Sequence, residues 1–194
     1  MFYRPTEGHG LPHNPFNAIV SPRPIGWISS RSATGVENLA PYSFFNAVAY
    51  VPPQVMFASV GSKDSIRNIR ETGEFCVNLV SAAQISVMNA SSEALDFHED
   101  EFTHSGALRA PCRDIACSRV EDAPAALECK MTQIVQLEGK DNHVVFGTVV
   151  AIHIRPDCVV DGRFDAVKAR MLSRLGYRDY AEVTEVFELT RPND

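Results

Sequence analysis

The sequence predicts a mainly β fold, in which a barrel carries a few short helices at its periphery. Compact apolar runs of strand length occur at residues 55–60 and 75–80, and such runs are typical of buried strands. Two longer runs, 127–137 and 143–155, are separated by the turn-like segment 138–142. The second long run is apolar on both faces, which indicates either a barrel or a sheet with one face packed on another subunit.

The remaining elements follow from local signals along the chain. Two prolines precede residues 25–30, so the chain enters this predicted strand in an extended conformation. Residues 65–72 place Ile66 and Ile69 at helical spacing and end at Gly73, a common helix terminator. We therefore expect few helices, each of them short.

A capping-box pattern at residues 81–84 predicts the start of a second helix. Residues 92–117 are polar and irregular, and we expect them to form an excursion on the surface of the domain. The chain has 194 residues, no internal repeat and no linker-like segment. These features predict a single domain spanning residues 1–194.

Composition and net charge limit the kinds of molecule that this chain is expected to bind. The net charge is −6 and 45% of the residues are hydrophobic, so the chain is a globular protein with little attraction for nucleic acid or anionic membrane. No apolar run approaches the ~20 residues that a membrane span needs. The N-terminus lacks the order of a signal peptide. Five irregularly spaced cysteines indicate reduced thiols, and we expect a cytoplasmic protein.

A first group of hydrogen-bond donors lies between the strand at 55–60 and the helix at 65–72. Ser62, Lys63 and Ser65 surround the predicted helix start, where free N–H groups favour an anion such as phosphate. The alternative is an ordinary helix cap beside a solvated lysine.

Two further segments bring donors and aromatic residues together. Ser29, Ser30 and Arg31 end the first predicted strand without a nearby carboxylate, and the alternative is a β-edge with a hydroxylated turn. Residues 38–46 combine small, aromatic and polar residues, including Ser43, a mixture that suits the edge of a planar heteroaromatic ring. The alternative for 38–46 is a segment of the aromatic core.

Metal and thiol chemistry are weaker hypotheses, and we expect no metal. His98, Glu99, Asp100, Glu101 and His104 are close in sequence, with Cys112 and Cys117 beyond them, but their spacing matches no zinc motif. Thiol chemistry at Cys112 and Cys117 would require the two side chains to be exposed and close. Cys76 and Cys129 fall within predicted strands and are expected to be core residues.

Taken together, these segments resemble the flavin reductase-like FMN-binding proteins, the relatives of flavoredoxin with a split β-barrel fold. The likeness runs in order from about residue 16 to residue 180, through 22–25 with Trp27, 38–46, 63–69, 71–75, 77–78, 88–91, 100–102, 127–129, 143–147 and 174–177. The resemblance implies an FMN-binding split barrel with a core of about 16–180, short arms at both ends, and FMN at the interface of a homodimer.

The resemblance also implies roles for individual residues. Ser62, Lys63 and Ser65 would hold the phosphate, and Ser29, Ser30 and Arg31 would lie around the phosphate and ribityl chain. The isoalloxazine ring would meet Ala40, Pro41, Tyr42, Ser43 and Asn46, with Asn68 as a further polar contact. The site would be closed by residues from the same chain or from the partner chain, namely Arg174, Leu175, Gly176 and Tyr177.

The activity implied by the resemblance is NAD(P)H-dependent reduction of FMN, with reduced flavin passing to an oxygenase or another acceptor. His143 would orient NAD(P)H, because related reductases carry an Asp-His pair here. In this chain Asn142 separates His143 from Asp141, and a surface histidine is the alternative. An FMN-containing electron carrier without direct NAD(P)H reaction, or a non-catalytic flavin-binding module, are the alternative functions.

Overall fold

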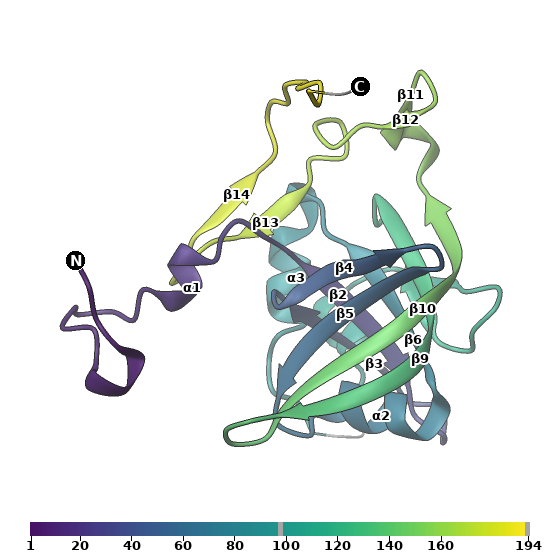
Figure 1. Ribbon diagram of the computed structural model, residues 1–194. Helices are drawn as coiled ribbons and strands as arrows, with labels where there is room; N and C mark the ends of the chain where they lie inside the picture. The colour runs from purple at the N-terminus through teal and green to yellow at the C-terminus, as the bar shows by residue number, and fades with distance from the viewer. Residues whose placement is uncertain (97–98, 193–194) are drawn as a thin grey trace.

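The computed structural model describes residues 1–96 and 99–192 and confirms the mainly β prediction. Its centre is a strongly curved seven-stranded sheet in the order β3-β2-β6-β9-β10-β5-β4, with antiparallel neighbours throughout (Figure 1). The strands are β2 (Gly26–Arg31), β3 (Glu37–Tyr42), β4 (Phe45–Tyr50), β5 (Pro53–Val60), β6 (Glu74–Leu79), β9 (Ala125–Leu137) and β10 (Asn142–Ile154).

Smaller elements surround this sheet. Strands β1 (Arg23–Pro24), β13 (Leu172–Arg174) and β14 (Tyr180–Glu182) form a three-stranded ribbon beside it, and two short hairpins join β7 (Arg109–Pro111) to β8 (Ser118–Val120) and β11 (Val159–Val160) to β12 (Arg163–Phe164). The α-helices are α1 (Phe16–Ile19), α2 (Asp64–Thr72), α3 (Ile85–Ala90) and α4 (Glu101–Ser105), and single 3₁₀ turns occupy η1 (Pro5–Glu7), η2 (Ala82–Gln84) and η3 (Pro156–Cys158).

Local chemistry explains where the helices begin and end. Ser81 and Gln84 form both hydrogen bonds of the predicted capping box. Helix α2 ends where Gly73 adopts a left-handed conformation, as expected of a glycine terminator. The prediction for residues 92–117 was wrong in part, because Asp100 accepts hydrogen bonds from the amides of Phe102 and Thr103 and starts helix α4 there.

Two groups of buried side chains hold the fold together. Inside the barrel, the Phe57 and Phe75 rings meet edge to face with centroids 5.6 Å apart, and the apolar side of α2 packs against them. A second cluster around Trp27 and Phe102 joins β2 to α3 and α4. Strand β10 approaches Phe75 very closely at Gly147, where an added Cβ would lie 2.6 Å from the ring.

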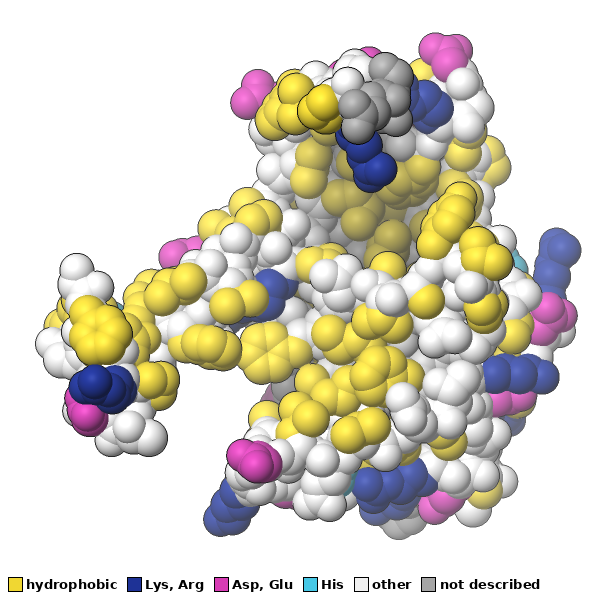
Figure 2. All heavy atoms as spheres, viewed as in Figure 1, with side chains coloured by type: hydrophobic (Ala, Val, Ile, Leu, Met, Phe, Trp, Pro, Cys, Tyr) yellow, Lys and Arg dark blue, Asp and Glu magenta, His cyan; other side chains and the backbone are white. Residues whose placement is uncertain are grey.

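The two apolar faces of β10 have different environments. His143, Val145 and Val149 point into the barrel and are buried. On the opposite face, Val144 and Phe146 are only partly buried, and they line an apolar cavity of about 950 Å³. Figure 2 shows hydrophobic side chains gathered on the face that β4, β5 and β10 present to the viewer. The barrel therefore accounts for one apolar face of β10 and leaves the other open.

No helix within residues 1–96 or 99–192 is long and apolar enough to cross a membrane.

Candidate functional site

The loop between β5 and α2 places Lys63 at the start of the helix. Gly61 takes a positive φ of 86°, and Asp141 holds the loop through its carbonyl, 2.7 Å from the Gly61 amide, and its carboxylate, 3.1 Å from the Ser62 amide. Lys63 adopts an extended conformation and α2 has no side-chain cap. Within the described residues, the Lys63 ammonium has no ion-pair partner, so its charge is available to an anion.

Below this loop, hydroxyl and amide groups are hydrogen-bonded to one another. The Ser65 hydroxyl donates to Asn38 Oδ1 over 2.7 Å, and the Asn38 amide donates to Glu101 over 2.8 Å. Asn68 donates to the Ser30 hydroxyl over 3.2 Å. Burial raises the pKa of Glu101, although the hydrogen bonds that its carboxylate accepts oppose the rise. This network fixes the ends of β2 and β3 against α2.

A cavity of about 480 Å³ lies above this network, between β3, β5 and the start of α2. Six of the predicted residues line it: Ala40, Pro41, Tyr42, Ser43, Lys63 and Ser65. A second cavity of about 320 Å³ contains Arg174, Leu175 and Tyr177. The two cavities share Pro41, Ser43 and Ser92 among their lining residues, so the structure joins the predicted ring segment to the C-terminal ribbon.

Arg23 positions the ribbon against the N-terminal segment. Its guanidinium donates to the Leu175 carbonyl over 2.8 Å and also to the carbonyls of Asn17 and Val20. Gly176 lies against helix α1, where an added Cβ would come within 2.3 Å of Ala18. Backbone packing therefore accounts for the glycine at position 176.

Eight predicted residues line neither of these two cavities: Ser29, Ser30, Arg31, Asn46, Ser62, Asn68, His143 and Gly176. Ser29 is fully buried and donates to the Ser118 carbonyl over 2.6 Å. Arg31 lines a different cavity, beside Cys112. Ser62 points its hydroxyl toward Arg70, which donates to it over 3.4 Å. Asn46 lines a third, apolar cavity of about 950 Å³ that also includes Ser43.

His143 is buried inside the barrel end of β10, with only 4% of its surface exposed. Its Nε2 lies 2.7 Å from Asp141 Oδ1, and its Nδ1 lies 3.4 Å from Arg70. The surface interpretation of His143 was therefore wrong. The Asp-His pair forms despite the intervening Asn142, but the imidazole supports the 61–62 loop through Asp141 and does not line either cavity.

Sequence reasoning missed the structural importance of Asn38 and Glu101. Both line the 480 Å³ cavity, and the Glu101 carboxylate also accepts a hydrogen bond from the Leu39 amide. Glu101 belongs to the segment 100–102 that resembles the family. The sequence could not show, however, that the fold brings this carboxylate next to β3.

The histidine-rich acidic segment shows no metal site in its described part. His98 lies outside the described residues, and His104 pairs with Glu93 over 2.8 Å. Among residues 1–96 and 99–192, no group of three potential metal ligands comes together. Cys76 and Cys129 are fully buried, as predicted.

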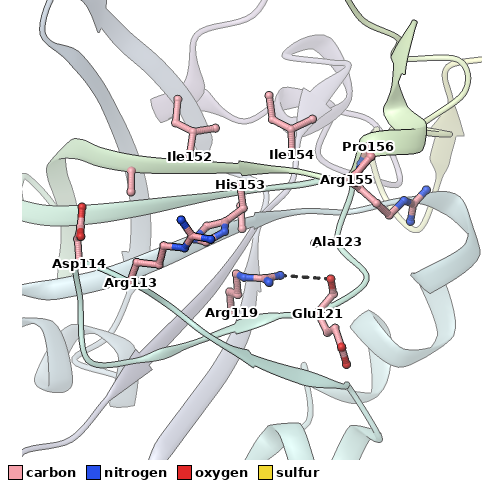
Figure 3. A pocket seen from close by; sticks show the side chains of 12 residues that line it. Arg113, Asp114, Arg119, Glu121, Ala123, Ile152, His153, Ile154, Arg155 and Pro156 are labelled. Atoms are coloured by element: carbon pink, nitrogen blue, oxygen red, sulfur yellow. Dashed lines mark hydrogen bonds between the residues drawn. The ribbon is translucent and has the colours of Figure 1, made fainter.

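A further cavity of about 570 Å³ lies at the other end of β9 and β10 and contains none of the predicted residues (Figure 3). Arg113, Arg119 and His153 point into the same region. The imidazole of His153 lies 2.5 Å from Glu128, a carboxylate with no exposed surface.

Comparison with known proteins agrees with this architecture. The profile of the flavin reductase like domain matches residues 20–168. An uncharacterized protein of Deinococcus radiodurans is 40% identical over 187 residues, covering 90% of this chain and 82% of its own.

Solved structures show the same fold. Nitrilotriacetate monooxygenase component B of Bacillus cereus superimposes with a TM-score of 0.91 at 28% identity, over 97% of this chain and 98% of its own. The 2-nitrobenzoate 2-nitroreductase of Pseudomonas fluorescens gives 0.83 at 32% identity, over 91% and 88%. A split-barrel protein of Shewanella frigidimarina, 19% identical, covers 91% of this chain and 89% of its own with a TM-score of 0.84. That last likeness confirms the split-barrel fold.

Proposed function

Because this chain belongs to the flavin reductase like family, we propose that it binds FMN and catalyses hydride transfer from NAD(P)H to the flavin. The observation that carries the proposal is the pair of adjoining cavities. They connect Lys63, which has no ion-pair partner among residues 1–96 and 99–192, to the side chains of Ala40, Pro41, Tyr42 and Ser43. FMN combines a dianionic phosphate with a flat heteroaromatic ring, so it matches both ends of this arrangement.

The donor set at the start of α2 fits a phosphate. Asp64 also lines this cavity, but Arg67 pairs with its carboxylate. Glu93 lies 2.8 Å from His104, and Glu101, which also lines the cavity, accepts hydrogen bonds from the Asn38 side chain and the Leu39 amide. The Lys63 ammonium then provides the attractive charge, and the uncapped amides of α2 add donors of the same kind.

The ring would lie along Ala40, Pro41, Tyr42 and Ser43. Proline and alanine present apolar surface, and Ser43, which all three cavities share, is placed to donate to a polar ring edge. Bound FMN would supply the redox chemistry by accepting a hydride, while the protein supplies position and electrostatics. Ser30 and Asn68 would act indirectly, by holding Asn38 and Ser65 in place.

A second copy of the chain would complete the site. Phe44, Val48 and Leu137 are 40–47% exposed on the open face of the sheet, and the apolar cavity of about 950 Å³ on this face is lined by Ser43 and Asn46 as well. A contiguous apolar patch exposed on a protein is typical of an interaction site. Because the patch shares Ser43 with the two other cavities, a partner seated there would also border the flavin.

The acceptor of the electrons would be an oxygenase. The structural relative from Bacillus cereus is component B of a nitrilotriacetate monooxygenase, a name that describes one component of an oxygenase. We expect this chain to supply reduced flavin to such a partner protein.

The first test is a flavin titration that compares Lys63→Ala with Lys168→Ala. Lys168 is an exposed lysine outside both cavities, so its variant controls for the loss of a positive charge. Hydrogen bonds to a charged group contribute about 1.5–3 kcal/mol, so Lys63→Ala should weaken FMN binding by roughly 10- to 150-fold. Equal affinities for the two variants would remove Lys63 from the site.

The second test separates a reductase from an electron carrier. Protein loaded with FMN is mixed anaerobically with NADH and, separately, with NADPH, and the visible absorption is followed. Bleaching by either nucleotide supports the reductase. A flavin that binds but stays oxidised would assign the protein to the electron carriers, and a chain that binds no FMN would refute the proposal.

The dimer is tested with Val48→Asp, which places a charge on the open face. We expect sedimentation to show a dimer for the wild-type chain and a monomer for the variant, with weaker FMN binding in the monomer. A wild-type monomer that binds FMN tightly would contradict the shared site.

A further inference from the structure

Two cysteines lie at the neck of the loop that connects β7 and β8. Pro111 pairs with Ser118 as the last residue pair of this hairpin, so Cys112 and Cys117 occupy the next position on each side. Facing residues of antiparallel strands have Cα atoms about 4.5–5.5 Å apart, which lies within the range that a disulfide bridges. The register therefore makes the two cysteines neighbours across the neck of the loop.

The surroundings of the two thiols are unequal. Cys112 is half-buried and lines a cavity of about 570 Å³ together with Arg31 and Cys117. Cys117 is 3% exposed, and its sulfur lies 3.7 Å from the Ser29 carbonyl. A third thiol, Cys76, is fully buried and packs in the same cluster. A small solute can therefore reach Cys112 first. Cys117 is not exposed, contrary to the requirement that both thiols be exposed, and it can react only through Cys112.

The pKa values of the two thiols also differ. The neighbouring thiols of Cys117 and Cys76 lower the pKa of Cys112. The interaction with Cys112, together with burial, raises the pKa of Cys117. Cys112 is consequently the thiol of the pair that ionises more readily, beside a partner that stays protonated to higher pH, which is the arrangement of a reactive cysteine and its resolving partner.

We infer that Cys112 and Cys117 form an oxidisable dithiol that hydrogen peroxide converts to an intramolecular disulfide. The Cys112 thiolate attacks one peroxide oxygen, the O–O bond breaks, and the products are Cys112 sulfenic acid and hydroxide. The Cys117 sulfur then attacks the Cys112 sulfur, an S–S bond forms and water leaves. Two thiols lose two electrons in total, and peroxide is reduced to two waters.

Hydrogen bonds to two carboxylates hold the loop between the two cysteines in place. The amides of Arg113 and Asp114 donate to Glu128 over 2.8 and 2.7 Å, and the Ala116 amide donates to Glu74 over 2.8 Å. Oxidation would close this loop covalently. Arg113 and Asp114 also line the cavity in Figure 3. The disulfide would therefore constrain the lining of that cavity. The inference holds whether or not the chain binds flavin.

Peptide mapping distinguishes this disulfide from its rivals. Trypsin cuts after Arg109, Arg113 and Arg119, so a bond between Cys112 and Cys117 joins residues 110–113 to residues 114–119. A bond to Cys76 would instead join 110–113 to 71–109. The intact protein, treated with hydrogen peroxide and then alkylated under denaturing conditions, should lose two of its five thiols, and dithiothreitol should restore both.

Single variants test the assigned roles. Cys112→Ser should slow the peroxide-dependent loss of thiols by roughly tenfold or more, because an ordinary thiol is only a few per cent ionised at pH 7. Cys117→Ser should leave a sulfenic acid on Cys112 that dimedone traps in a one-to-one adduct. Cys158→Ser removes a buried thiol outside the cluster and should react as the wild type does.

Several outcomes would overturn the inference. They are retention of all five thiols, a linkage between Cys112 and Cys76, a disulfide between two chains, or oxidation of Cys112 beyond the sulfenic acid while Cys117 stays reduced. If Cys117→Ser proves unstable, the wild-type peptide map alone still decides among these outcomes.

Discussion

Replacing Glu128 by glutamine tests how the buried carboxylate at the far end of β9 contributes to stability. Its Oε1 accepts from the Arg113 amide at 2.8 Å and lies 2.5 Å from His153 Nε2, while its Oε2 accepts from the Asp114 amide at 2.7 Å. A glutamine keeps one acceptor but turns an NH₂ group toward one of these donors. The change therefore loses at least one charge-assisted hydrogen bond.

The expected cost is about 2–4 kcal/mol, because one charge-assisted hydrogen bond is worth about 1.5–3 kcal/mol and a buried donor loses its partner. For a chain of this length, such a loss lowers Tm by roughly 5–15 °C. Urea unfolding at pH 7 measures the cost directly. Glu121→Gln removes an exposed carboxylate from the mouth of the same cavity and should change stability by less than about 0.5 kcal/mol.

The pH dependence provides an independent check. Burial alone would raise the pKa of Glu128, but the hydrogen bonds from His153 and the two loop amides outweigh burial and lower it. A carboxyl whose pKa falls on folding stabilises the protein above its unfolded pKa, and that contribution disappears as pH falls through the folded pKa. The difference between wild type and Glu128→Gln should therefore shrink below about pH 4. A difference that stays constant with pH, or a cost at pH 7 no larger than that of Glu121→Gln, would refute this reasoning.

Three further changes have defined outcomes. Gly147→Ala should destabilise the fold by about 1–3 kcal/mol through overpacking, because the new Cβ meets the buried Phe75 ring. The control, Gly162→Ala, lies at an open turn where the new Cβ meets no atom within 4 Å, so it should cost only the strain of its positive φ. Thermal unfolding compares the two variants. Asn78→Ala should cost about 2–4 kcal/mol in urea unfolding, since its side chain donates to the Trp27 carbonyl and accepts from the Val120 amide; a cost below about 1 kcal/mol would contradict that account. His143→Gln should weaken FMN binding by a few-fold at most, as expected for indirect support of the loop, and a loss of hydride transfer with unchanged FMN affinity would favour direct contact with the nicotinamide.

The sheet was largely predictable from sequence because its signals are local. The runs at 127–137 and 143–155 became strands 125–137 and 142–154, since a long apolar run beside a polar turn determines a hairpin without help from distant residues. The two alternatives for the second run both proved relevant, because one face of β10 fills the barrel and the other face lies open. Helix α4 was missed, because its start depends on one aspartate in a polar segment.

The candidate site was less predictable, because side-chain direction is a tertiary property. Ser29 and Ser30 are adjacent on β2, and strand geometry sends adjacent side chains to opposite faces. Ser30 consequently joins the network with Asn38, whereas Ser29 bonds the β8 segment on the other side. No sequence pattern could choose between them without knowing which face meets α2. The cysteine pair depended on register in the same way, since 112 and 117 become neighbours only across a closed hairpin.

The ribbon that carries Arg174 and Tyr177 has fewer supporting contacts than the barrel strands that line the rest of the proposed ligand site. It joins the rest of the fold through the buried side chain of Leu172, a hydrogen bond from the Leu172 amide to the Val80 carbonyl over 2.9 Å, and a bridge between Met171 and Ser81, whereas β9 and β10 share a ladder along their whole length. Regions with few supporting contacts open independently of the rest of a fold. Amide hydrogens of residues 172–182 should therefore exchange with solvent well before those of β9. A ligand that occupies both cavities at Pro41 would contact the ribbon and the barrel together. Its binding should therefore slow amide hydrogen exchange in the ribbon before it slows exchange in the barrel.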